Sequence, residues 1–91
     1  MCVEYNEWLK EVESGIRERI FCNVTWDTEN GGITVESAVF NVMVSTKTDG
    51  DILKKLYDYH YSANDIANAI CKDIKLKWLE LIEKKEDAKN A

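Results

Sequence analysis

The most reactive side chains in this sequence are one histidine, His60, and three cysteines, Cys2, Cys22 and Cys71. An imidazole beside a thiol can take its proton and make it a nucleophile. Cys71, however, falls on the apolar side of a helix-like segment, and Cys22 falls on the apolar side of a strand-like one. Buried cysteines of this kind are usually inert, and no Cys-x-x-Cys spacing favours zinc. The pattern therefore predicts no catalytic residues, no metal site and no cofactor.

Asp49-Gly50-Asp51 resembles the beginning of a calcium-binding loop, in which alternating carboxylates supply the oxygen ligands that calcium prefers. The further ligands and the glutamate at the end of such a loop are missing from the sequence that follows. A turn followed by a helix start, with Asp51 in the first turn, explains the same residues. No pair of carboxylates stands apart from the general acidity as an acid and a base. We therefore expect a protein that is not an enzyme.

The charge is uneven along the chain. Residues 1–65 carry 12 acidic and 6 basic side chains, whereas residues 66–91 carry 5 and 6. The formal net charge of −5 disfavours direct contact with nucleic acid or with an anionic membrane, since both reward a basic patch. We expect instead that the partner is another protein with a basic surface. The alternative is that the acidity only keeps the protein in solution.

The candidate partner-binding residues are acidic or aromatic side chains that the periodicity places outside the core. Exposed carboxylates can imitate a line of phosphates, and tyrosine is enriched at the energetic centres of interfaces. Leu76 and Leu79 also lie off the apolar side of their helix and indicate a second packed or partner-facing surface. The alternative for each of these residues is ordinary surface or minor core. The predicted binding set is Asp27, Glu29, Glu36, Asp49, Asp51, Asp58, Tyr59 and Tyr61.

Two segments with helical period must position these groups. The longer one runs from Ser62 to about Lys85, and Ser62 followed by Asp65 suits a helix start. The other runs from Val3 to about Phe21. Each has an apolar stripe, which predicts that both contribute to one core. The stripe of the longer segment comprises Ala63, Ile66, Ala67, Ile70, Cys71, Ile74, Trp78, Leu81 and Ile82.

Between these segments the period changes to that of strands. Residues 22–26 alternate, and Asn30-Gly31 supplies the positive φ angles of a tight hairpin. The run Ile33–Ser45 is long for one strand, and its apolar positions change from odd to even numbers. Either a bulge near Glu36-Ser37-Ala38 or a break into two strands accounts for this change. A second, shorter helix is expected from Thr48 to Tyr61.

These elements predict an α+β fold: an N-terminal helix, an antiparallel β-hairpin or small three-stranded sheet, and two C-terminal helices packed on one face. We expect one compact domain over residues 1–91, of which residues 86–91 fray. The edges of so small a sheet stay open, which makes homodimerisation through an edge a second hypothesis. The sequence shows no signal peptide, no apolar run of the about 20 residues needed to cross a bilayer, and an odd number of cysteines. We therefore expect a cytoplasmic protein.

This order of elements in a small acidic chain resembles that of some phage-encoded anti-CRISPR inhibitors. The segments that carry the resemblance are Tyr5–Phe21, Cys22–Ser45, Thr48–Tyr61 and Ser62–Lys85. The resemblance implies an inhibitor that works in the host cytosol and covers the nucleic-acid-binding surface of a CRISPR effector. Because it is a likeness of layout, it assigns no role to individual residues. The residues leave two alternatives: a structural or assembly protein that dimerises through its sheet edge, and a small DNA-binding regulator.

Overall fold

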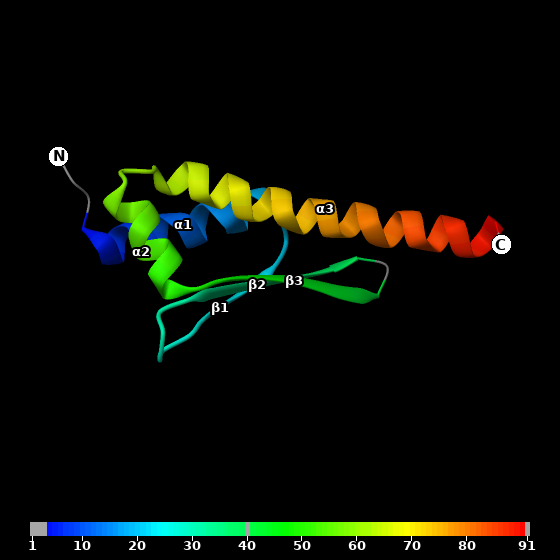
Figure 1. Cartoon of the computed structure of the whole chain (residues 1–91), viewed down its shortest axis with the longest axis horizontal. Helices are drawn as coiled ribbons and strands as arrows, with labels where there is room; N and C mark the ends of the chain where they lie inside the picture. Colours follow the sequence, from blue (N-terminus) through cyan, green and yellow to red (C-terminus); the bar gives the residue numbers. More distant parts are fainter. Residues whose placement is uncertain (1–3, 40, 91) are drawn as a thin grey trace.

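The structure, a computed structural model, describes the backbone of residues 4–39 and 41–90. Helix α1 (Tyr5–Arg19) precedes three strands, β1 (Asn23–Trp26), β2 (Ile33–Val39) and β3 (Val42–Thr48), and two helices follow, α2 (Gly50–Asp58) and α3 (Ala63–Asn90). The strands form one antiparallel sheet in the order β1-β2-β3. The helices lie on one side of this sheet (Figure 1). The expected α+β fold is therefore confirmed, with the three-stranded form of the sheet.

Helix α1 packs along the first half of α3. Trp8, Val12 and Ile16 follow one another at one-turn intervals and are all buried. The two helices approach so closely at Gly15 that a Cβ there would lie 2.8 Å from the Cβ of Ala67. Small residues on both helices allow this approach. The two predicted stripes therefore meet in one core.

The long apolar run after residue 32 forms two strands and not one bulged strand. β2 and β3 pair without interruption, from Ile33 opposite Thr48 to Val39 opposite Val42. The bulge is therefore wrong and the break is right, although the break lies between Val39 and Val42. Asn41, with a φ of 64°, has the positive angle that a glycine often provides. In this register odd-numbered residues of β2 lie opposite even-numbered residues of β3, which explains why the apolar positions change parity.

One face of the sheet is covered by the helices and the other is open. Ile33, Val35 and Ser37 of β2 and Val44 of β3 are buried on the covered face. The Ser37 hydroxyl donates a hydrogen bond to the Phe21 carbonyl (2.9 Å), so this buried polar group is satisfied. None of the described helices lies on the opposite face (Figure 1). The side chains there are mostly polar: Asn23, Thr25, Thr34, Glu36, Met43, Ser45 and Lys47.

Helix α3 begins where the sequence predicts. The Ser62 hydroxyl accepts a hydrogen bond from the Asp65 N–H (3.1 Å), as an N-cap does. The backbone stays helical to Asn90, so the predicted end near Lys85 is too early, and fraying of residues 86–91 stays a prediction. Although α3 is long, neither it nor any other described helix is apolar enough to cross a membrane.

Helix α2 is shorter than predicted. It begins at Gly50 and ends at Asp58. Tyr59, His60 and Tyr61 therefore lie in the connection to α3 and not on a helix face. His60 has a φ of 65°, and this left-handed residue turns the chain back toward α3.

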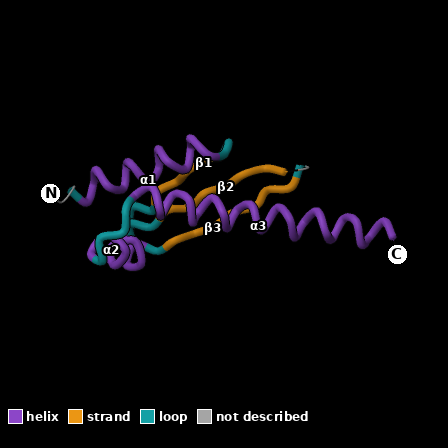
Figure 2. Tube along the Cα trace, turned by 90° about the horizontal axis from the view of Figure 1, so that it is seen from above, coloured by secondary structure: helices purple, strands orange, loops and turns teal. Residues whose placement is uncertain are grey.

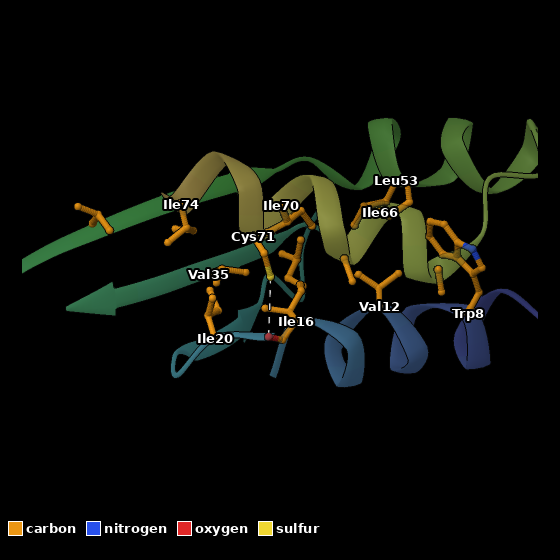
Figure 3. Packing of buried hydrophobic residues seen from close by; sticks show 14 residues of the cluster. Trp8, Val12, Ile16, Ile20, Val35, Leu53, Ile66, Ile70, Cys71 and Ile74 are labelled. Atoms are coloured by element: carbon orange, nitrogen blue, oxygen red, sulfur yellow. Dashed lines mark hydrogen bonds between the residues drawn. The ribbon is translucent and has the colours of Figure 1, made fainter. Parts of the chain in front are cut away.

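The core lies between the helices and the covered face of the sheet (Figure 3). It contains Cys71, whose thiol points at the backbone carbonyl of Ile16 on α1 (3.8 Å). At the other end of α1, the Trp8 indole donates a hydrogen bond to the Tyr61 carbonyl (2.9 Å). This bond ties α1 to the connection between α2 and α3.

Helix α3 crosses over β3 on its way along the molecule (Figure 2). Before the crossing it lies on the side of β3 toward β2, and beyond the crossing it lies on the side away from β2. Lys77 of α3 donates a hydrogen bond from Nζ to the Ser45 carbonyl of β3 (2.5 Å), which places the two elements in contact. The C-terminal half of α3 thus overhangs the outer edge of the sheet.

Candidate protein-binding surface

Four of the predicted carboxylates gather at one end of the molecule, where the β1–β2 turn meets the start of α2 (Figure 1). Asp27 and Glu29 belong to the turn, and the Asp27 side chain accepts a hydrogen bond from the Glu29 N–H (2.8 Å). Asp49 and Asp51 stand on either side of Gly50, the first residue of α2. We call these four residues the acidic end.

A close backbone contact holds the two parts of the acidic end together. Gly50 faces the backbone of Asn30, and a Cβ at residue 50 would overlap the Asn30 carbonyl. Gly32 likewise lies against the backbone of Thr48 and Asp49. The Asn30 side chain accepts a hydrogen bond from the Gly32 N–H (2.7 Å), which fixes the turn. The turn and the start of α2 therefore form one surface.

The four carboxylates of the acidic end are not neutralised within the protein. None of them forms an ion pair with another described residue, whereas Asp58 pairs with Lys54 (3.3 Å) and Asp73 with Lys77 (3.5 Å). Negative charges that gather at a surface make the local electrostatic potential more negative, and this attracts a cationic partner. The acidic end is thus a cluster of negative charge that no described ion pair balances.

The other predicted binding residues lie elsewhere. Glu36 is on the open face of the sheet, opposite Asn23 and Ser45. Asp58 is at the end of α2 in its ion pair with Lys54. Tyr59 and Tyr61, 73% and 51% exposed, lie in the connection between α2 and α3. The structure therefore divides the predicted set into the acidic end, the tyrosine connection (Tyr59 and Tyr61), and the separate residues Glu36 and Asp58.

A groove that the sequence analysis missed connects the first two of these regions. It has a volume of about 600 Å³ and lies between α2, α3 and β3. Its lining includes Ile52, which is 49% exposed and follows Asp51 in the sequence, and Tyr61 from the α2–α3 connection. Ile52 is half exposed, although its neighbour Leu53 on the same helix is fully buried. The lining is Thr46, Thr48, Ile52, Leu56, Tyr61, Asp65, Ile66, Ala69, Ile70 and Asp73.

Among the described residues, Cys22, Cys71 and His60 have no arrangement that suits nucleophilic chemistry. Burial raises the pKa of the Cys71 thiol and of the Cys22 thiol above the ordinary value, which disfavours the reactive thiolate. His60 is exposed in the α2–α3 connection, whereas Cys71 is in the core. Within residues 4–39 and 41–90, no three histidine, cysteine or acidic side chains gather in a way that could hold a metal ion.

Tyr5 and Trp8, which could have formed a binding platform, are part of a packed aromatic cluster. Their rings stack at 6.0 Å, and Tyr57 of α2 meets Trp8 edge-on at 5.5 Å. Lys54 lies over the Tyr5 ring, 4.8 Å from its centre. This cluster joins α1 to α2 and so supports the position of α2 beside the groove.

Comparison of the chain with protein-family models, with curated proteins and with solved structures finds no significant match in any of the three.

Proposed function

We propose that this protein is a non-enzymatic inhibitor that binds another protein by placing its acidic end on a basic surface. The partner surface is one that otherwise binds nucleic acid, and the likeness of layout to anti-CRISPR inhibitors suggests a CRISPR effector in the host cytosol. The observation that supports the proposal is the acidic end itself, with Asp27 and Glu29 held against Asp49 and Asp51 by the contact of Gly50 with Asn30.

The fold brings together four negative charges that repel one another. Holding unpaired carboxylates at one site costs free energy, and the cost is recovered when a cationic surface approaches. Such an interaction acts over about 8–10 Å at physiological ionic strength and weakens as salt is added. Binding through the acidic end should therefore be fast and sensitive to salt.

The experiment begins with affinity capture from the source cell and identification of the protein that is retained. Binding of the purified partner is then measured at increasing salt, for the native chain and for a variant with lysine at positions 27, 29, 49 and 51. We expect affinity to fall with salt and to be lost in the variant. A matched control carries lysine at four exposed glutamates elsewhere, Glu7, Glu11, Glu80 and Glu83, and should retain most of the affinity.

Two results would overturn the proposal. One is binding that does not respond to salt, and the other is binding that survives reversal of the acidic end. Competition with nucleic acid tests the inhibitory role, because a protein that covers a nucleic-acid-binding surface must displace the nucleic acid. Circular dichroism of both variants shows whether the fold is retained.

A second candidate is a structural protein that assembles with itself. Leu76 and Leu79 on α3 are 50% and 53% exposed, and β3 is an edge strand of the sheet. This function predicts a dimer or larger assembly in solution at moderate concentration. Sedimentation that shows a monomer at high concentration would rule it out.

A further inference from the structure

The register of the sheet determines which residues of β3 direct their N–H and C=O groups to its outer edge. The Asp27 N–H donates a hydrogen bond to the Gly32 carbonyl (2.8 Å), which fixes the phase of the β1–β2 ladder. In an antiparallel ladder the bonded residues alternate, so Thr34 and Glu36 of β2 bond to β1. Each strand residue directs its N–H and its C=O to the same side of the strand. The β2 residues at the alternate positions therefore bond to β3 and not to β1. In β3 the outward residues are therefore Met43, Ser45 and Lys47.

One of these outward groups is occupied by a side chain. Lys77 donates from Nζ to the Ser45 carbonyl (2.5 Å), and its ammonium also lies 3.5 Å from Asp73. The carbonyl thus takes a donor at the position where the N–H of a neighbouring strand would lie. A lysine at a sheet edge is a known device against unwanted strand pairing. Lys77 therefore occupies the Ser45 carbonyl until another hydrogen-bond donor replaces it.

The space beside this edge suits a further strand. The groove lies along the covered face of β3, where Thr46 and Thr48 form part of its lining. A strand paired with β3 would direct alternate side chains into the groove, against Ile52 and Ala69. The C-terminal half of α3 overhangs the same side of β3 (Figure 2), so the strand would be covered as β2 is.

We propose that β3 accepts an extended segment of the partner protein as a fourth strand, and that this segment is apolar on one face and basic. This inference rests on the proposed function and adds where and in what conformation the partner binds. Charge supports a basic partner, because Asp65 lines the groove without a described ion pair and the acidic end adjoins the groove. A second copy of this chain carries the same net charge of −5 and is disfavoured in that place.

The opposite edge of the sheet is less suited to the same role. β1 has four residues against the seven of β3, so it offers fewer outward backbone groups. The space near its start is lined by Arg17, Glu18 and Arg19 together with residues 20–22, and it is mostly polar. Basic residues there would repel the same partner segment.

The probe for the test is a synthetic peptide of alternating valine and lysine with blocked ends and the length of β3. Its binding is followed by titration, and its position by nuclear magnetic resonance of the backbone amides. We expect saturable binding and slower hydrogen exchange at the amides of Met43, Ser45 and Lys47, with Val24 and Trp26 of β1 unchanged. A peptide of the same sequence with methylated backbone nitrogens cannot donate backbone hydrogen bonds to β3 and should not bind.

Two pairs of matched variants locate the site. Lys77→Met removes the cover from the Ser45 carbonyl and should tighten peptide binding by about threefold, whereas Lys75→Met removes the same charge from an exposed position and should change it less. Ile52→Lys places a cation in the groove and should weaken binding by about tenfold. Leu79→Lys, at a position of similar exposure, should not.

Failure of the peptide to bind would overturn the fourth-strand proposal, as would binding that protects the β1 amides. A dimer of the native chain with protected β3 amides would show that a second copy takes the place instead. These outcomes are distinct from those for the proposed function, because salt-sensitive binding of the partner through the acidic end can persist when the peptide does not bind.

Discussion

Gly50 and Asn30 are in backbone contact, although they are 20 positions apart and belong to different elements. Their contact joins the β1–β2 turn to the first turn of α2 and so assembles the acidic end. No larger residue fits at position 50, because its Cβ would overlap the Asn30 carbonyl and neither backbone segment can move alone.

We therefore predict that Gly50→Ala destabilises the protein by about 2–3 kcal/mol, as expected for overpacking against backbone. Denaturant unfolding followed by circular dichroism measures this change. Gly31→Ala is the control in the same turn: it meets no atom within 4 Å and costs only the strain of a φ of 74°, about 1 kcal/mol. Equal losses in the two variants would contradict the contact.

A second prediction concerns Gly15, which lies against Ala67 where α1 and α3 meet. Gly15→Ala gains about 0.5–1 kcal/mol of helix propensity but places two Cβ atoms 2.8 Å apart, and we expect a net loss of about 1 kcal/mol. Ala67→Gly in the same chain should restore part of that loss by removing one of the two Cβ atoms. A double-mutant cycle of unfolding free energies measures the coupling, and additive effects would show that the helices are not in contact there.

Two of the three tryptophans, Trp8 and Trp78, should respond in opposite ways to loss of their indole N–H. Trp8 donates to the Tyr61 carbonyl, so Trp8→Phe loses a hydrogen bond and leaves an acceptor, at a cost of about 1–3 kcal/mol. The buried Nε1 of Trp78 has no hydrogen-bond acceptor among the described residues. Apart from the cost of the smaller side chain, Trp78→Phe should therefore leave the free energy of unfolding unchanged or raise it. A larger loss at Trp78 than at Trp8, measured by denaturant unfolding, would contradict this assignment.

The stability of the protein should fall in alkaline solution because of its thiols. Burial raises the pKa of the Cys71 thiol in the folded state above 9.0, so the unfolded chain loses this proton first as pH rises. The contribution of the neutral Cys71 thiol to the free energy of unfolding is complete below pH 9.0, and it is lost as pH rises through the folded-state pKa. Unfolding free energies of the native chain and of Cys71→Ala across this range measure the effect, and the variant should show the weaker dependence.

Reactivity of the same thiol gives an independent reading. Cys71 should react with an alkylating reagent only when the chain opens, because its side chain is buried against α1. Labelling followed by mass spectrometry at native and denaturing conditions distinguishes the two states. Rapid modification of Cys71 in the folded protein would contradict the packing.

The helices could be predicted from the sequence because apolar residues at 3.6-residue spacing report directly on which side is buried. Val12, Ile16 and Ile74 are buried as that spacing requires, and Ser62 caps α3 as its residue type suggests. The turn after β2 was harder, because Asn41 adopts a positive φ without the glycine or proline that usually marks such a place.

The surface was predictable only in part. Residue types identify carboxylates as candidates, but which of them gather depends on the contact of Gly50 with Asn30, and nothing local to either residue reveals it. The groove is formed by residues of α2, α3 and β3 together, and among them Ile52 is left half exposed. Surface features that form where two elements distant in the sequence meet leave no local pattern of residues from which to predict them.

The length of α3 has a practical consequence for attaching labels or fusion partners. α1 begins beside α2, where the rings of Tyr5 and Tyr57 are 5.0 Å apart, whereas α3 carries the other terminus to the far end of the molecule (Figure 1). A purification tag or fluorophore joined after Asn90 would therefore stand clear of the acidic end. A group attached at Tyr5 would instead lie at the end of the molecule that carries α2 and the acidic end (Figure 1).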